Sequence, residues 1–208
     1  MVKATPDFSL EIATGAQLVA GVDEAGRGPL CGPVMAAAVI FPHRDIDIPV
    51  IIRDSKQMTP RMRARAYDWI IQNTIWAVAE CSPAEIDELN ILHASMTAMH
   101  RAIKKLSHTP DHCLIDGNKL PSNLIGTAVV HGDAKSLSIA AASIIAKETR
   151  DRHMHHLAQQ YPQYGWDKNA GYPTKSHLQA IDQYGINQHY RKSFGPIKER
   201  IKNDTSHN

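Results

Sequence analysis

The order of short apolar segments is the feature of this chain that most limits its fold. Segments with the composition of β-strands cover residues 17–23, 34–41, 74–81, 112–116 and 124–130. A short turn rich in Gly and Pro separates the first two, which can therefore pair antiparallel. Three strands come early and the later ones alternate with helices. The sequence thus predicts an α/β fold, a mixed five-stranded sheet flanked by helices.

Capping signals mark where the helices begin. Thr59 precedes Pro60 at the start of a predicted helix that reaches about residue 72. Ser82 and Glu85 form a capping box for a second helix, which we expect to run to about residue 106 with a break near Asn90. Further helices are predicted over residues 137–160, 174–184 and 197–202. We interpret residues 1–15 as a loose segment and residues 165–173 as irregular.

The 208 residues are 43% hydrophobic and 21% charged, which is a globular composition and not a disordered one. No linker divides the chain. We therefore expect one domain over residues 17–160 with a helical appendage over 161–202, a flexible segment over 1–16 and a disordered tail over 203–208. The longest apolar run, residues 34–41, is too short to span a membrane, and no signal peptide is evident. Three widely spaced cysteines favour reduced thiols and a cytoplasmic location.

Acidic residues follow three of the predicted strands. Asp23 and Glu24 close the first strand, Asp116 closes the fourth, and Asp133 lies just beyond the fifth. In an open sheet, residues just past the strand ends line the functional crevice. Carboxylates that converge there repel one another unless divalent cations are bound, and an all-oxygen cluster suits Mg²⁺ or Mn²⁺. Each aspartate taken singly could instead be a turn former or a helix cap.

Glycines and basic residues near these carboxylates suit an anionic ligand. The tripeptide Gly26-Arg27-Gly28 directly follows the acidic pair, and its backbone can approach a phosphodiester or a sugar closely, although alone it would indicate a surface turn. Two basic clusters indicate either contact with a nucleic-acid backbone or a solvated surface. They are Arg53, Lys56, Arg61, Arg63 and Arg65, and Arg191, Lys192, Lys198, Arg200 and Lys202. We interpret His153, His155 and His156 as a solvated helix face, because a structural metal site requires four ligands.

Together these residues resemble the bacterial ribonuclease HII family of type 2 ribonucleases H. The matching segments occur in the family's order and cover roughly residues 17–200. They are residues 21–30 (GVDEAGRGPL), 54–56 (DSK), 115–118 (IDGN), 132–133 (GD), 139–147 (IAAASIIAK), 150–151 (RD), 171–174 (GYPT), His177, Gly185 and 193–196 (SFGP). Each motif is weak alone, whereas the combination is highly specific.

The resemblance implies a ribonuclease H-like catalytic domain with a C-terminal helical part that binds substrate. It implies hydrolysis of the RNA strand of RNA–DNA hybrids, incision 5′ to ribonucleotides embedded in duplex DNA, and a role in removing such ribonucleotides and RNA primers. The residues that match the family's catalytic, metal-binding carboxylates are Asp23, Glu24, Asp116 and Asp133. The residues that match its substrate contacts are Gly26, Arg27 and Gly28 in the ribose-reading loop, Tyr172 at the sugar beyond the RNA–DNA junction, and Lys56 and Ser143 at the backbone.

The expected chemistry is an in-line displacement assisted by two divalent ions, which gives 3′-hydroxyl and 5′-phosphate ends. Asp23, at the end of the central predicted strand, is our candidate to contact both ions. Two alternatives stay open: another metal-dependent nuclease of the same fold, such as a resolvase, and a non-catalytic nucleic-acid-binding protein. The intact carboxylates disfavour the latter, because negative charge in a phosphate-binding cleft weakens binding. The chain end carries no pattern typical of a sliding-clamp peptide, so we expect no clamp tether of that kind. We also expect the protein to be a monomer.

Overall fold

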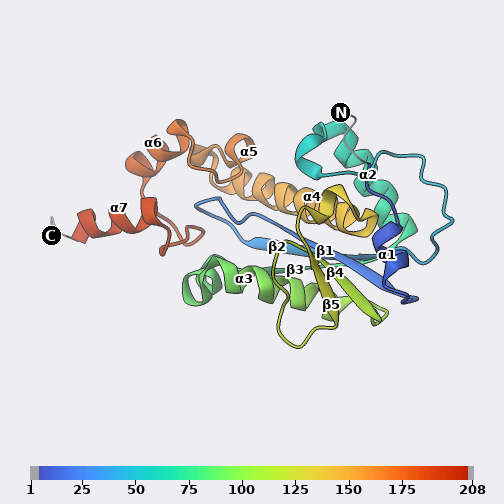
Figure 1. Ribbon diagram of the computed structural model, residues 1–208. Helices are drawn as coiled ribbons and strands as arrows, with labels where there is room; N and C mark the ends of the chain where they lie inside the picture. Colours follow the sequence, from blue (N-terminus) through green and yellow to red (C-terminus); the bar gives the residue numbers. More distant parts are fainter. Residues whose placement is uncertain (1–4, 206–208) are drawn as a thin grey trace.

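A five-stranded mixed sheet forms the centre of the computed structural model, which describes residues 5–205 (Figure 1). Its strands are β1 (Val19–Ala25), β2 (Val34–Ile40), β3 (Ile75–Cys81), β4 (His112–Asp116) and β5 (Gly126–Val129), in the spatial order β3-β2-β1-β4-β5. β1, β2 and β3 pair antiparallel, whereas β1, β4 and β5 pair parallel. The predicted mixed sheet is confirmed, and β1 is its central strand.

Helices cover both faces of the sheet. α3 (Pro83–Lys105) packs on one face, and α4 (Leu137–Gln160) with α2 (Pro60–Asn73) covers the other (Figure 1). Alternate residues of β2 supply both cores: Ala36 and Ala38 face α3, while Ala37 and Val39 face α4. The capping box of α3 is confirmed, and its predicted break lies at Asn90, where φ is 64°.

A glycine lets α4 lie directly on the central strand. A Cβ atom at Gly21 of β1 would lie 2.1 Å from the carbonyl carbon of Ser138, so only glycine permits this approach. Ser136 caps α4 by accepting from the Ile139 N–H at 3.1 Å. The first half of α4 is buried because it lies between the sheet and α2. This close packing brings Ser143 of α4 to the end of β1.

The C-terminal region packs on the second half of α4. It contains a 3-10 turn, η3 (Pro162–Tyr164), then α5 (Trp166–Asn169), α6 (Lys175–Tyr184) and α7 (Gly195–Thr205) (Figure 1). A separate apolar cluster joins this region to Leu30 and Met154. Although residues 147–156 are mostly polar, Glu148, Arg150 and Met154 among them are buried.

Two boundary predictions also need correction. Part of the segment expected to be irregular, residues 165–173, forms the short helix α5. The last helix begins at residue 195 and continues through 205, so residues 203–205 of the predicted disordered tail are helical. Residues 206–208 of that predicted tail lie outside the described residues.

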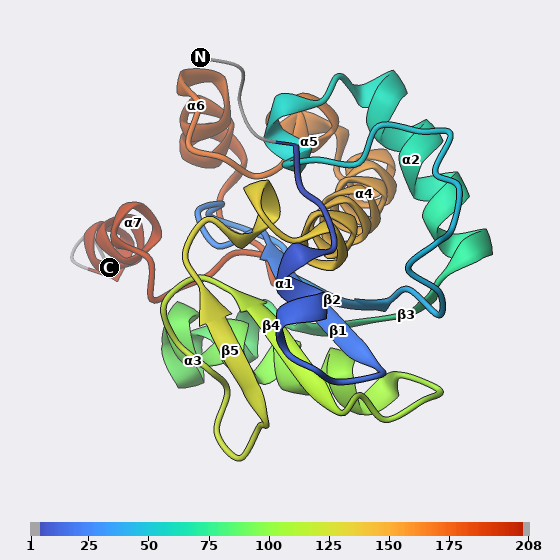
Figure 2. The ribbon, with the colours of Figure 1, turned by 45° about the vertical axis from the view of Figure 1, so that its right-hand side comes forward.

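The N-terminal segment is anchored and not loose. Helix α1 (Ser9–Ala13) lies close to α4 (Figure 2). The buried carboxylate of Glu11 accepts hydrogen bonds from Ser136 Oγ at 2.6 Å and from Ser138 N at 2.9 Å. These partners are more than a hundred residues away along the chain, so no local pattern reveals them. Residues 1–4 of the predicted flexible segment lie outside the described residues.

The three cysteines are unpaired, as predicted, and all three are buried. Across residues 5–205, we find no helix with both the length and the apolar character needed to cross a bilayer.

Candidate active site

Strand register brings carboxylates from distant segments to one edge of the sheet. Val22 of β1 pairs with Ile115 of the parallel strand β4, so the next residues, Asp23 and Asp116, lie on neighbouring strands. Asp116 ends β4, whereas β1 continues two residues past its predicted end at Asp23, to Ala25. Asp116 Oδ1 accepts from the Gly132 N–H at 2.7 Å. That bond draws the 3-10 turn η2 (Gly132–Ala134), with Asp133, to the same edge. The predicted convergence of the strand-end carboxylates is therefore present.

These carboxylates destabilise one another's ionised forms. Burial raises the pKa of Asp23 well above its usual value, and the charges of Glu24 and Asp116 raise it further. Burial also raises the pKa of Glu24, although Arg27, whose Nη1 lies 3.2 Å from Glu24 Oε1, opposes this rise. The pKa of Asp133 is raised by burial and then by the nearby carboxylate of Asp116. Burial and, to a smaller extent, repulsion between carboxylates therefore both disfavour the ionised forms in this site.

A further carboxylate, Asp54, lies beside Asp133 and raises its pKa. Asp54 caps the 3-10 turn η1 (Ser55–Gln57), because its Oδ1 accepts from the Lys56 N–H at 2.9 Å. Its Oδ2 accepts from Gln57 Nε2 at 2.8 Å. Sequence reasoning used Asp54 only as part of a family motif, because no strand precedes it. Its proximity to Asp133 depends on tertiary structure alone.

The donor set fits a hard divalent cation. Across residues 5–205, no three His, Cys, Asp or Glu side chains already stand in a metal-binding arrangement. The four predicted carboxylates nevertheless supply only oxygen atoms, the donors that Mg²⁺ and Mn²⁺ prefer. Burial and mutual repulsion raise the pKa of three of them, Asp23, Glu24 and Asp133, and a bound cation would relieve that repulsion.

Two hollows meet at Lys56, beside these carboxylates. The first, of about 320 Å³, is lined by Asp23, Glu24, Gly26, Arg27, Gly28, Lys56, Ser143 and Tyr172, among others. The second, of about 840 Å³, is lined by residues that include Arg53, Asp54, Lys56, Asp116, His131, Asp133 and Lys135. The structure thus gathers every catalytic and substrate-binding residue predicted from the sequence around two adjoining hollows.

Ser143 is buried behind Asp23. Only 5% of its surface is exposed, and its hydroxyl lies 2.8 Å from Ser55 Oγ. A hydrogen bond from Ser143 also lowers the pKa of Asp23, against the larger effect of burial. The hydroxyl expected to contact substrate is thus already hydrogen-bonded within the protein.

Tyr172 lines the first hollow next to Gly28. Its side chain is 45% exposed, and its Cε1 lies 3.3 Å from the position that a Cβ atom of Gly28 would take. His177 of α6 fixes the turn by donating from Nδ1 to the Tyr172 carbonyl oxygen at 2.8 Å. Trp166 Nε1 donates to His177 Nε2 at 3.1 Å, which fixes the neutral ring in one tautomer. The tyrosine ring is therefore presented from a rigid support.

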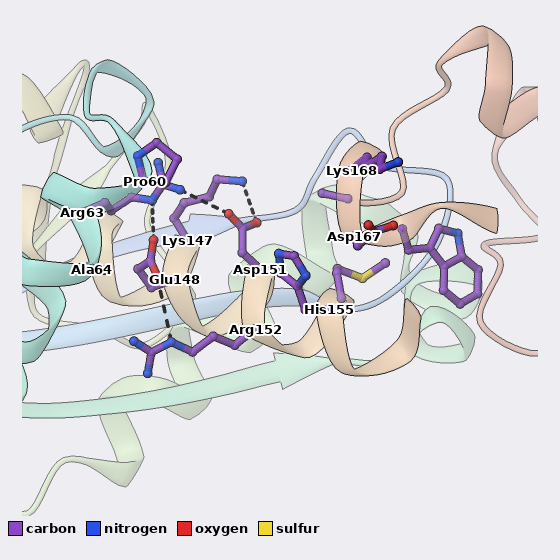
Figure 3. Close-up of a pocket in the computed structure, with 13 residues that line it drawn as sticks. Pro60, Arg63, Ala64, Lys147, Glu148, Asp151, Arg152, His155, Asp167 and Lys168 are labelled. Carbon is purple, nitrogen blue, oxygen red and sulfur yellow. Dashed lines mark hydrogen bonds and ion pairs between the residues drawn. The ribbon is translucent and has the colours of Figure 1, made fainter. Parts of the chain in front are cut away.

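The two predicted basic clusters each contain one arginine that is not at the surface. Arg63 is buried, and its Nε lies 2.6 Å from Glu148 Oε1 beside a hollow of about 410 Å³ (Figure 3). Lys147 pairs with Asp151 at 2.7 Å in the same hollow (Figure 3). Arg191 is also fully buried. For these two arginines, both interpretations offered above, nucleic-acid contact and solvated surface, are wrong, because tertiary contacts enclose them.

The histidines of the predicted solvated helix face differ in exposure. His155 and His156 are exposed on α4, whereas His153 is half-buried. Burial lowers the pKa of His153, which favours its neutral form.

Solved structures share this fold and arrangement of elements. The ribonuclease H2 of Pyrococcus horikoshii OT3 matches with a TM-score of 0.74 and 30% identity over 92% of this chain and all of that chain. The ribonuclease HII in a complex with PCNA from Archaeoglobus fulgidus matches with a TM-score of 0.71 and 22% identity, over 86% of this chain and 95% of that chain. A ribonuclease HIII crystallised with Mn²⁺, termed Bst-RNase HIII, matches with a TM-score of 0.67 and 17% identity, over 92% and 71% of the two chains. The fold is therefore that of the type 2 ribonucleases H.

Sequence comparison narrows this class to one family. A model of the family "Ribonuclease HII" matches residues 20–195. A curated ribonuclease HII of Magnetococcus marinus is 53% identical over 206 residues, which cover 94% of this chain and 95% of the relative. One of Paracoccus denitrificans is 53% identical over 197 residues, covering 92% and 93%. The chain belongs to the ribonuclease HII family and is an endoribonuclease that acts on RNA–DNA hybrids.

Proposed function

We propose that this enzyme also incises duplex DNA on the 5′ side of an embedded ribonucleotide, using divalent ions held by Asp23, Glu24, Asp116 and Asp133. The observation that carries this proposal is the position of these carboxylates. Asp23 and Glu24 line the hollow that also contains Gly26-Arg27-Gly28 and Tyr172, and Asp116 and Asp133 line the adjoining hollow. Lys56 lines both hollows. Acidic groups that repel one another suit catalysis on a phosphodiester only if cations are bound among them.

The carboxylates would hold the ions, and the rest of the site would hold the substrate. Divalent ions bound there would activate the attacking water and stabilise the leaving 3′ oxygen, so that cleavage leaves a 3′-hydroxyl and a 5′-phosphate. Asp23 is buried, and the charges of both Glu24 and Asp116 act on it, so its carboxylate is our candidate to help hold both ions. Ser143 would keep the Asp23 carboxylate in place through its hydrogen bond, and we assign it this role instead of direct substrate contact.

The chain's own groups can identify the target sugar. A ribose differs from deoxyribose by its 2′-hydroxyl, which both donates and accepts hydrogen bonds. The backbone of Gly26-Arg27-Gly28 can approach that hydroxyl because the glycines carry no side chain. Tyr172, exposed beside Gly28, would pack on the next sugar, where an additional 2′-hydroxyl would crowd the ring.

Lys56 would contact the phosphate backbone. It lines both hollows, and its position is fixed because Asp54 caps the turn that carries it. A lysine in this position would attract a phosphate by its positive charge. Such a contact does not depend on the base sequence of the substrate. We further expect the enzyme to act as a cytoplasmic monomer that removes ribonucleotides and RNA primers from DNA.

The test is incubation with duplex DNA that contains one ribonucleotide. We expect one incision directly 5′ to the ribonucleotide in Mg²⁺ or Mn²⁺, with 3′-hydroxyl and 5′-phosphate ends, and none after chelation. Comparison of the two metals identifies the preferred ion. Incision in EDTA, or a 3′-phosphate end, would contradict the proposal.

A further inference from the structure

Two arginines are buried behind the Gly26-Arg27-Gly28 loop without a carboxylate partner. Arg150 of α4 is 1% exposed, and Arg191, between α6 and α7, is 0% exposed. Within residues 5–205, neither forms an ion pair with Asp or Glu, and Asp151 and Asp87 act on them only at longer range. Buried charges are normally paired, so this arrangement requires a specific reason.

Arg191 binds the carbonyl oxygens of the loop. Its Nη2 donates to Gly26 O at 2.6 Å, its Nη1 donates to Arg27 O at 3.0 Å, and its Nε donates to Gly32 O at 3.0 Å. The planar guanidinium presents several N–H donors in a fixed fork, which suits three carbonyls from one turn. The aromatic ring of Phe194 lies beside it, 5.1 Å from the guanidinium carbon.

These contacts determine the direction of the loop's N–H groups. In a trans peptide unit the C=O and N–H bonds point in opposite directions. Because the Gly26 and Arg27 carbonyls point towards Arg191, the N–H groups of Arg27 and Gly28 point away from it. Neither N–H donates to another residue that the structure describes. Two adjacent donors are therefore left available on the side of the loop away from Arg191.

Arg150 holds the same loop from a second direction and joins it to the Tyr172 turn. Its Nε donates to Pro33 O, its Nη2 to Cys31 O and its Nη1 to Ala170 O, each at 3.1 Å. The packing is tight, since a Cβ atom at Gly26 would lie 2.1 Å from Arg150 Nε. One side chain thus fixes the spacing between the loop and the turn that carries the tyrosine.

Both guanidinium groups are charged at neutral pH. Burial lowers the pKa of Arg191 to about 9, with a further contribution from the charge of Arg150. Burial likewise lowers the pKa of Arg150. The positive charges behind the loop therefore favour an anionic chain in front of it.

We propose that Arg191 and Arg150 are positioning residues for sugar recognition: by binding the loop carbonyls, they aim the Arg27 and Gly28 N–H groups at the 2′-hydroxyl. This inference rests on the proposed function, in which that loop reads the sugar. Arg150 borders the first hollow but is only 1% exposed, and Arg191 is 0% exposed. In this proposal both arginines therefore act through the backbone of the loop.

The variant Arg191→Lys keeps the positive charge and removes the fork. The measurement is the preference for ribose, defined as the inhibition constant of an all-DNA duplex divided by the KM of the same duplex with one ribonucleotide, in Mg²⁺. We expect the variant to lower this preference by about tenfold to a hundredfold, since misplacing a positioned group by about 1 Å has an effect of that size. Inhibition by the all-DNA duplex should stay unchanged, because it depends on phosphate contacts.

The matched control is Arg44→Lys. Arg44 also donates to a backbone carbonyl, that of Ala16 at 2.6 Å, but lies outside the two hollows at the active site. Its ribose preference should equal that of the wild type. An unchanged preference in a folded Arg191→Lys protein would overturn the inference, as would an equal weakening of both duplexes. No cleavage by the wild type would instead refute the proposed function.

A second measurement on the wild type needs no variant to fold. Amide hydrogen exchange of Arg27 and Gly28 should be fast in the free enzyme. Exchange should slow when the duplex with one ribonucleotide is bound in EDTA, and it should slow less with the all-DNA duplex. Amides that are already protected in the free enzyme, or equal protection by the two duplexes, would overturn the inference.

Discussion

Two loops flank the carboxylates, and buried arginines support both of them in different ways. The loop at residues 55–58, which carries Lys56, is held by Arg63, whose Nη1 donates to the carbonyls of Ser55 and Met58, each at 3.3 Å. Arg63 is neutralised by Glu148 and lies 3.5 Å from Asp151. The loop at residues 26–33 is held by Arg150 and Arg191, whose hydrogen bonds all go to backbone carbonyls.

The difference suits the two tasks that we assign to these loops. Because Glu148 neutralises Arg63, the positive charge that the first loop presents to a phosphate is that of Lys56. The second loop presents N–H groups. Arg150 and Arg191, which support it, have no carboxylate partner and add positive charge behind these groups. Carboxylate partners at Arg150 and Arg191 would compete with the loop carbonyls for the same N–H donors. Sugar recognition thus depends on backbone orientation, while phosphate contact depends on a side chain.

The largest effect should come from the carboxylates between the two loops. Asp23→Asn should lower turnover by at least about a thousandfold, as loss of a catalytic group does. The metal-free melting temperature should not fall, because the substitution removes a buried, repelled charge. The exposed Asp45→Asn serves as the control. Near-normal turnover of Asp23→Asn would remove the assigned site.

The neutralised support can be broken from its acidic side. Glu148→Gln leaves Arg63 buried without its closest partner, which should cost about 3–5 kcal/mol of folding free energy. The double variant Arg63→Met, Glu148→Leu should regain only part of this stability. An apolar pair can replace a buried ion pair, but it leaves the Ser55 and Met58 carbonyls without their Arg63 donor. Urea denaturation measures both. A Glu148→Gln protein as stable as the wild type would show that the two loops do not differ in this way.

The second loop can be displaced directly. Gly26→Ala places a Cβ atom against Arg150 at a φ of 94°, whereas Gly15→Ala has a φ of 69° with nothing within 4 Å. Gly15→Ala should lose about 1 kcal/mol of stability from backbone strain. Gly26→Ala should lose more, because its Cβ atom must also displace the buried Arg150. Only Gly26→Ala should lower single-ribonucleotide cleavage, by up to about a hundredfold. Equal activities of the two variants would mean that the loop position does not matter.

The positions of the strands and helices could be predicted from the sequence because local chemistry determines them. Ser82 and Glu85 cap α3 within four residues, and the break at Asn90 also has a local signal. The carboxylates were found because strand ends converge in an open sheet. These inferences need no knowledge of which distant segments touch.

The supports of the two loops could not be predicted, because their partners are far apart in the sequence. Arg191 belongs to a basic cluster by composition, and only the fold shows that it binds Gly26, 165 residues away. Arg63 and Glu148 are 85 residues apart. Glu11 was assigned to a loose segment for the same reason. A charged residue gives the same local signal whether it is exposed or buried against a backbone.

Substitution of Tyr172 should have a smaller effect, which differs between the two substrates. Tyr172→Ala should reduce cleavage at a single ribonucleotide roughly tenfold more than cleavage within an all-RNA hybrid, which corresponds to a stacking contact of about 1–3 kcal/mol. Tyr172→Phe keeps the ring and serves as the control. An unchanged ratio of the two activities would show that the ring packs without reading the junction.

Lys56 should have the smallest and least selective effect. Lys56→Met should weaken both substrates by a similar factor of a few, and it should reduce the slope of log KM against log salt concentration by about 1. Steady-state kinetics over a salt series measures both quantities. If Lys56→Met weakened cleavage only at the single ribonucleotide, the loop that carries Lys56 would read the sugar, and our assignment of that task to the other loop would be wrong.

The central claim is that backbone groups approach one 2′-hydroxyl closely. It is tested most directly by a single duplex position that carries ribose, 2′-O-methyl ribose or deoxyribose in otherwise identical DNA. We predict incision at ribose only, because the methyl group removes the donor and fills the space that the glycine backbone leaves. Incision 5′ to the 2′-O-methyl nucleotide at a rate near that of ribose would contradict the account.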